Sequence, residues 1–113
     1  MSLLTTLFGT KKTSDNIAIL NKDTYADAIK GNRVQLVDVR TANEFRSGHI
    51  KNAINIDFFN ATNFKKYFEE LDKEKPVYVY CRSGARSLKA ARRLVNMGFT
   101  QIYDLKGGYM RWG

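Results

Sequence analysis

Apolar residues along this chain follow two spacings, one typical of buried strands and the other of amphipathic helices. Short runs rich in apolar residues predict strands at 17–20, 34–39, 54–56, 77–80 and 102–105. Helical spacing predicts helices over 25–29, 64–71 and 88–95, and a capping box formed by Thr41 and Glu44 predicts a short helix through Arg46. Strands that alternate with helices predict an α/β fold with a largely parallel sheet and helices on both sides.

Two groups of aromatic residues are expected to pack in the core of this fold. Phe64, Tyr67, Phe68 and Leu71 recur at i, i+3, i+4 and i+7, which predicts a helix with an aromatic inner face. Core packing explains this stripe better than a cage for a ligand. The second group follows the turn at 107–108 and forms an apolar tail expected to fold back on the body: Tyr109, Met110 and Trp112.

The length of 113 residues fits one domain, with a core over about 17–112 and an N-terminal extension over 1–14. The hydrophobic fraction of 43% comes without an apolar run long enough to cross a bilayer, so we expect no membrane span. The first residues are a poor fit to a signal peptide, because Lys11 and Lys12 follow the apolar part and no long apolar region comes after them. We therefore expect a cytoplasmic protein.

Charge and cysteine content narrow the possible chemistry. The net charge of +8 suits anionic partners, but the basic residues are spread in pairs and form no stripe interleaved with aromatic residues, so we expect no nucleic-acid partner. A single cysteine excludes an intramolecular disulfide and suits a reducing compartment. With one histidine and no clustered carboxylates at ligand spacing, we expect no metal and no cofactor.

The single cysteine follows the predicted strand 77–80 and precedes a helical pattern. The loop reads Cys81-Arg82-Ser83-Gly84-Ala85-Arg86-Ser87. Gly84 permits backbone conformations in which consecutive N–H groups turn inward, and the following helix directs the positive end of its dipole at the loop. These groups stabilise an anionic sulfur, so we expect a thiol with a lowered pKa and a reactive thiolate.

Arginines on both sides of the loop strengthen this interpretation. Guanidinium groups at Arg82 and Arg86 can hold a doubly charged donor through bidentate hydrogen bonds. Cations at the start of a helix are unfavourable unless an anion offsets them. Ser87 is expected to bond a loop carbonyl or to cap the helix. The alternative is a buried, inert thiol next to solvated arginines, since free cysteine commonly behaves as a small hydrophobic residue.

Four stretches occur in a characteristic order: residues 36–40, residues 44–50 with 53–55, the loop 81–87, and residues 105–108 with Trp112. Together they resemble the rhodanese-like sulfurtransferases in their single-domain form, over residues 17–112. The resemblance implies a three-layer sandwich with a central, mostly parallel sheet of about five strands. It also implies that Cys81 is the nucleophile that carries a persulfide, cradled by the backbone from Arg82 to Arg86.

The resemblance further implies structural roles for several polar residues near the site. Arg40, Glu44 and His49 match family positions that support the fold, and Asp38 with Arg40 is expected to fix the strand end beside the loop. His49, the only histidine, could instead act as a general base for the thiol. A thiol already stabilised by its loop has no need of a base, which favours the structural role.

The implied reaction moves a sulfane sulfur from thiosulfate or a persulfide to a thiophilic acceptor through a Cys81 persulfide. The expected acceptor is cyanide or a cellular thiol, and the persulfide of another protein is a possible partner. One alternative is a cysteine-dependent phosphatase or arsenate reductase, but those loops have five residues between Cys and Arg, whereas four separate Cys81 from Arg86. Another alternative is a non-catalytic sulfur carrier or an interaction module.

Overall fold

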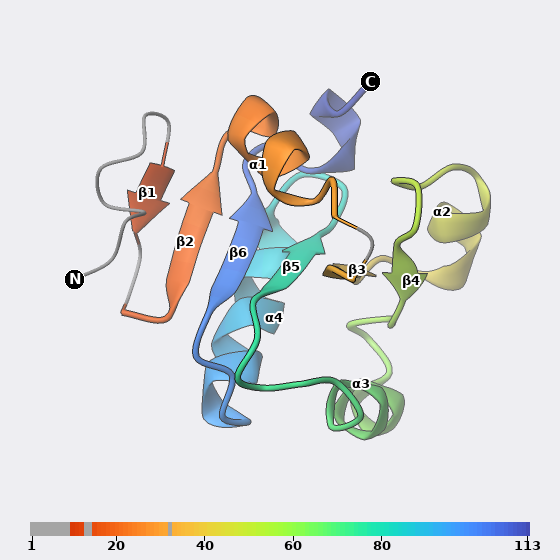
Figure 1. The fold of residues 1–113 in the computed structure, drawn as a ribbon. Helices are drawn as coiled ribbons and strands as arrows, with labels where there is room; N and C mark the ends of the chain where they lie inside the picture. Colours follow the sequence, from red (N-terminus) through yellow and green to blue (C-terminus); the bar gives the residue numbers. More distant parts are fainter. Residues whose placement is uncertain (1–9, 13–14, 32) are drawn as a thin grey trace.

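The computed structural model describes residues 10–12, 15–31 and 33–113, and within them one six-stranded sheet runs in the order β1-β2-β6-β5-β3-β4 (Figure 1). The strands are β1 Thr10–Lys12, β2 Ile17–Leu20, β3 Gln35–Asp38, β4 Ile54–Asn55, β5 Val77–Tyr80 and β6 Ile102–Leu105. The helices are α1 Lys22–Ala28, α2 Ala42–Arg46, α3 Ala61–Phe68, α4 Ala85–Asn96 and a 3₁₀ helix at Tyr109–Arg111.

The five strands expected from the sequence are all parallel. β5 lies between β3 and β6, with Val77 opposite both Gln35 and Ile102. β1 is an addition: it pairs antiparallel with β2 inside the stretch predicted to be an extension, of which residues 1–9 and 13–14 lie outside the described residues. Its three residues, Thr-Lys-Lys, carry no apolar alternation that would have predicted a strand.

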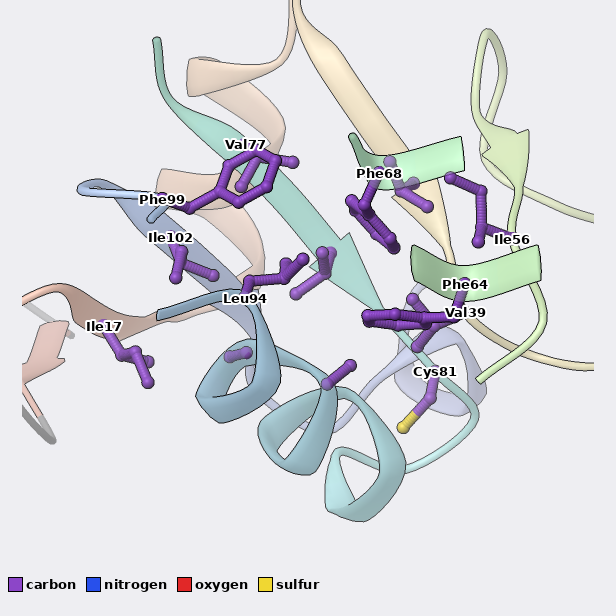
Figure 2. Packing of buried hydrophobic residues seen from close by; sticks show 14 residues of the cluster. Ile17, Val39, Ile56, Phe64, Phe68, Val77, Cys81, Leu94, Phe99 and Ile102 are labelled. Atoms are coloured by element: carbon purple, nitrogen blue, oxygen red, sulfur yellow. The ribbon is translucent and has the colours of Figure 1, made fainter. Parts of the chain in front are cut away.

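Side chains that alternate along the strands build two cores, one on each face of the sheet. Val77 and Val79 of β5 face α3 and α4, and this core is shown in Figure 2. Tyr78 and Tyr80 point to the opposite face, where α1 and the C-terminal segment cover the sheet. Because the central strands are covered on both sides, they read as nearly continuous apolar runs. No helix among the described residues has the length and apolar character to cross a membrane.

Two aromatic or apolar side chains expected in the core lie at the surface instead. Tyr67 is 41% exposed and Met110 is 56% exposed. Phe64 and Phe68, with ring centroids 4.5 Å apart, fill the contact of α3 with the sheet and leave Tyr67 on the flank of the helix. Met110 is directed outward from a short 3₁₀ helix whose neighbours Tyr109 and Trp112 pack against the core.

Side-chain caps determine where two of the helices begin. The capping box is confirmed: the Thr41 hydroxyl accepts from the Glu44 amide, and the Glu44 carboxylate accepts from the Thr41 amide. α1 begins at Lys22, three residues before the predicted start, because the Asn21 side chain accepts from the Thr24 amide at 2.9 Å. Both caps stand at the carboxyl ends of strands, so they also fix the entry of the loops at that edge.

Candidate active site

The cysteine loop begins at the carboxyl end of the central strand β5. Cys81 follows Tyr80 directly and is 1% exposed. Figure 2 shows Cys81 beside Val39 and Phe64, with its sulfur directed toward the first turn of α4. The Gly84 amide donates a hydrogen bond to Sγ over 3.0 Å. The thiol is therefore enclosed by the core on one side and by its own loop on the other.

The loop turns into α4 through a backbone conformation that favours glycine. Gly84 has a φ of 112° and stands immediately before α4, whose N-terminus has no side-chain cap. The first turn therefore keeps amide groups that no helical carbonyl accepts. Of the two expectations for Ser87, the bond to a loop carbonyl is confirmed, because its hydroxyl donates to the Gly84 carbonyl at 3.2 Å. The Ala85 side chain is exposed and plays no part in this enclosure.

The C-terminal segment supports the cysteine loop through backbone hydrogen bonds. The Tyr109 amide donates to the Cys81 carbonyl at 2.8 Å, and the Met110 amide donates to the Arg82 carbonyl at 2.9 Å. Gly108 permits this approach, because a Cβ there would collide with the Arg82 carbonyl and lie 2.6 Å from the Cys81 carbonyl oxygen. The turn at 107–108 thus reverses the chain and also allows the C-terminal segment to bond to the cysteine loop.

Arg86 is held by a carboxylate from α2. Its two terminal nitrogens donate to the two carboxylate oxygens of Glu44, at 2.7 and 2.9 Å. The hydrogen bond from Arg86 is the main cause that lowers the pKa of Glu44 to about 2, with further bonds from Thr41. This geometry differs from the expectation of a free guanidinium at the mouth of the loop. Glu44 offsets the Arg86 charge and fixes its direction.

Asp38 and Arg40 form a buried ion pair at the end of β3. The Arg40 Nη2 lies 2.7 Å from Asp38 Oδ2, and the same nitrogen donates to the Gly48 carbonyl at 2.7 Å. The Arg40 guanidinium lies over the ring of Tyr109, 4.5 Å from its centroid. The pair therefore joins the end of β3, the loop after α2 and the C-terminal segment that supports the cysteine loop.

His49 makes local contacts with α2. Its ring stacks on Phe45 with centroids 3.6 Å apart, and Nδ1 lies 2.8 Å from the Phe45 carbonyl oxygen. These contacts account for one ring nitrogen and one ring face, and within the described part of the chain they join the imidazole to Phe45 and not to Cys81. This arrangement favours the structural role over that of a general base.

Arg82 and Ser83 form the exposed lip of the loop. Both side chains are open to solvent. Within 10–12, 15–31 and 33–113, no ion pair engages Arg82, in contrast to Arg86. Arg82 is thus the cationic side chain of the loop that is open to an incoming anion.

A buried carboxyl behind the loop was not predicted from the sequence. Asp104 in β6 is 2% exposed, and its Oδ1 has no hydrogen-bond partner within the described residues. Burial raises the pKa of Asp104 to about 7, while the nearby Ser87 side chain and the Leu105 backbone oppose this shift. A lone Asp within an apolar strand pattern was the available signal, since β6 is covered on both faces.

Comparison with known proteins gives a consistent result. The family model described as the rhodanese-like domain matches residues 21–113. The chain is 46% identical over 81 residues to YqhL of Bacillus subtilis (strain 168), itself uncharacterized, covering 72% of this chain and 62% of that protein. It is 36% identical over 86 residues to the thiosulfate sulfurtransferase GlpE of Coxiella burnetii, covering 76% of this chain and 78% of that protein.

Solved structures share the same architecture. The structure of a rhodanese-like domain protein from Staphylococcus aureus matches with a TM-score of 0.71 at 28% identity, over 84% of this chain and 90% of that one. A second match, to a rhodanese-related protein from Thermoplasma volcanium, has a TM-score of 0.69 at 30% identity, over 82% and 87% of the two chains. The parallel sheet and its flanking helices are therefore a shared fold.

Proposed function

Because the chain belongs to the rhodanese-like family, we propose that it is a sulfurtransferase that carries a sulfane sulfur as a persulfide on Cys81. The observation that carries this proposal is the enclosure of the thiol, which accepts the Gly84 amide at 3.0 Å in front of an uncapped helix. Such a site stabilises a sulfur anion through fixed dipoles. The GlpE proteins that this chain resembles are named as thiosulfate sulfurtransferases, which agrees with this chemistry.

The reaction proceeds in two displacements. The Cys81 thiolate attacks the outer sulfur of thiosulfate, an S–S bond to Cys81 forms, and the S–S bond of thiosulfate breaks so that its electron pair leaves on sulfite. The products are the Cys81 persulfide anion and sulfite. Cyanide or a thiolate then attacks the outer sulfur, and the bond electrons return to Cys81 as thiolate. Neither step requires a proton to move, so the site needs no general base.

The loop residues divide this work between them. In this proposal the amides from Arg82 to Arg86 cradle the outer sulfur of the persulfide, which is supported by the Gly84 amide on Sγ and by the first turn of α4, whose amides lack helical partners. Arg82 at the lip attracts the anionic donor, and Arg86 holds the loop through Glu44. Asp38 and Arg40 fix the strand end next to the loop. A cytoplasmic location, with its reducing conditions, would suit a single reactive thiol.

Mass spectrometry after incubation with thiosulfate tests the proposal directly. We expect one added sulfur on Cys81, and steady release of sulfite when cyanide is supplied, with both lost in Cys81→Ser. Absence of the adduct would overturn the proposal. An adduct without turnover would indicate a sulfur carrier, and hydrolysis of an aryl phosphate without sulfur transfer would indicate a phosphatase.

A further inference from the structure

A hollow in the surface lies beside the lip of the cysteine loop. Its charged side chains are Lys22, Lys106 and Arg111, so we call it the basic hollow. Ser83, two residues after Cys81, forms one wall, so the hollow opens next to the thiol loop. Met110, whose side chain is 56% exposed, gives it an apolar part.

Three neighbouring strands bring these residues together. Lys22 begins the helix after β2, Lys106 follows β6, and the cysteine loop follows β5. The three strands lie side by side and parallel, so their carboxyl ends meet at one edge of the sheet, the upper edge in Figure 1. Arg111 comes from the 3₁₀ helix that is hydrogen-bonded to the carbonyls of Cys81 and Arg82. The basic hollow is thus built on the same elements as the cysteine loop.

The charge of the basic hollow is not neutralised. No carboxylate lines it, and among the residues that the structure describes no ion pair engages Lys22, Lys106 or Arg111. Two other hollows differ: one, at α3, combines Lys65 and Lys66 with Glu69, and the other, at α1, contains two aspartates. Neither is lined by a residue of the cysteine loop. Uncompensated cations beside a reactive group attract an anionic ligand.

The basic hollow has room for a ligand larger than thiosulfate. Its volume of about 690 Å³ is within the range of small-molecule sites, roughly 300–1,000 Å³. Thiosulfate consists of only five heavy atoms. Lys22, Lys106 and Arg111 come from three separate segments, which suits a ligand whose negative groups are spread over several carbon atoms.

We propose that the basic hollow binds the carrier part of a small thiol that has at least two anionic groups, and that this thiol exchanges sulfur with Cys81. This inference rests on the proposed sulfurtransferase function. In the forward direction the thiolate of the carrier attacks the outer sulfur of the Cys81 persulfide, a new S–S bond forms on the carrier, and the electrons of the broken bond return to the Cys81 thiolate. In reverse, the carrier persulfide donates its outer sulfur to the Cys81 thiolate.

A single-turnover comparison of two thiols tests the proposal. Cys81 is loaded with sulfur from thiosulfate, excess thiosulfate is removed, and loss of the persulfide is followed with mercaptosuccinate, which has two carboxylates, or with neutral 2-mercaptoethanol, at equal thiolate concentrations. We expect mercaptosuccinate to react faster. In Lys106→Glu/Arg111→Glu the ratio of the two rates should fall about 10-fold. The matched control Lys65→Glu/Lys66→Glu makes the same change of charge at α3 and should leave the ratio within about 2-fold.

The results separate this inference from the proposed function. Equal rates for the two thiols in the unmodified protein, or an equal fall in the control, would overturn the inference and leave sulfur transfer standing. If Cys81 takes no sulfur from thiosulfate, the proposed function fails. The basic hollow is then still tested in Cys81→Ser by NMR titration with mercaptosuccinate, which should shift the amides of Lys22, Ser83 and residues 106–111. Shifts confined to other regions would overturn the inference.

Discussion

Glu44 and Arg86 join two segments that lie 42 residues apart in sequence, through hydrogen bonds of 2.7 and 2.9 Å between both guanidinium ends and both carboxylate oxygens. Both side chains are partly shielded from solvent, Arg86 at 21% and Glu44 at 27% exposure. The first turn of α2 thereby orients Arg86, which lies where the cysteine loop passes into the first turn of α4. The pair leaves Arg82 as the cation at the lip that is open to an incoming anion.

Glu44→Gln is expected to lower the free energy of unfolding at pH 7 by about 1 kcal/mol, because it removes the charge from a bidentate pair and keeps the size of the side chain. Urea denaturation measures this change. Asp27→Asn is the matched control, since it breaks the exposed pair with Lys30, whose side chains are 76% and 77% exposed. The control should change stability by less than about 0.5 kcal/mol.

The effect of Glu44→Gln should depend on pH in a defined window. Because Arg86 lowers the pKa of Glu44 from 4.5 to about 2, the stabilisation is complete above the ordinary pKa and disappears as the pH falls through that interval. The stabilities of the variant and the unmodified protein should therefore converge toward pH 2. A difference that stays constant down to pH 2 would contradict the charged pair.

Asp104→Asn should make the protein more stable than the unmodified chain above pH 7. The folded protein holds the pKa of Asp104 near 7, against 3.8 for an exposed group, so it binds the proton more tightly than the unfolded chain does. Stability is thus lost as the pH rises from about 3.8 to 7 and is level beyond. Thermal unfolding from pH 4 to pH 8 should show the variant gaining on the order of 4 kcal/mol relative to the unmodified protein.

The surface variant Asp23→Asn serves as the control for this profile, because Asp23 is exposed in the first turn of α1. Its stability relative to the unmodified protein should show no comparable gain between pH 4 and pH 8. If Asp104→Asn followed the same flat profile, the carboxyl would not be buried in the charged state that we infer above pH 7.

Gly108→Ala is expected to damage both the fold and sulfur transfer. The added Cβ meets the carbonyls of Cys81 and Arg82, and the φ of 65° disfavours any other residue. We expect a loss of about 3 kcal/mol in unfolding free energy, together with slower sulfite release, because the base of the cysteine loop has to move. Gly31→Ala, whose nearest neighbour is Val34 Cγ2 at 3.4 Å, should be close to neutral in both assays. Normal sulfite release from Gly108→Ala would show that sulfur transfer does not depend on the contact between the C-terminal segment and the cysteine loop.

His49→Gln should keep sulfite release within about 2-fold of the unmodified protein. The imidazole stacks on Phe45 and contacts its carbonyl, so the substitution affects α2 and leaves the thiol unchanged. Loss of a general base would instead lower the rate by about 100-fold or more. Initial rates across pH 6–9 check this, and a fall of that size would restore His49 as a base.

The sequence predicted those parts of the molecule whose signals are local. The bounds of β2, β5 and β6 follow directly from apolar runs, and the capping box at Thr41 lies within four residues. Contacts between distant segments were not predictable, because which side chains pair depends on how the fold brings their loops together. The sequence therefore predicted a free guanidinium at Arg86, whereas the structure pairs it with Glu44.

The basic hollow could not be predicted from the sequence for the same reason. Lys22, Lys106 and Arg111 each read as an ordinary solvated cation in the sequence, and only the parallel order β2-β6-β5 places them around one space. For Asp104 the sequence predicted the strand but not the environment of the side chain. Its strand was predicted correctly, but the depth of its burial depends on α4 packing across the sheet.

The near-complete burial of Cys81, at 1% exposure, has a consequence for how the protein is protected between reactions. A thiol in this position offers little surface to bulky oxidants or alkylating agents, so the resting protein should survive oxidative stress well. Adding one sulfur extends the side chain by an S–S bond of about 2.05 Å. The persulfide form then presents its outer sulfur farther from the core. Sensitivity to oxidants and the ability to donate sulfur therefore increase together, when Cys81 carries the added sulfur.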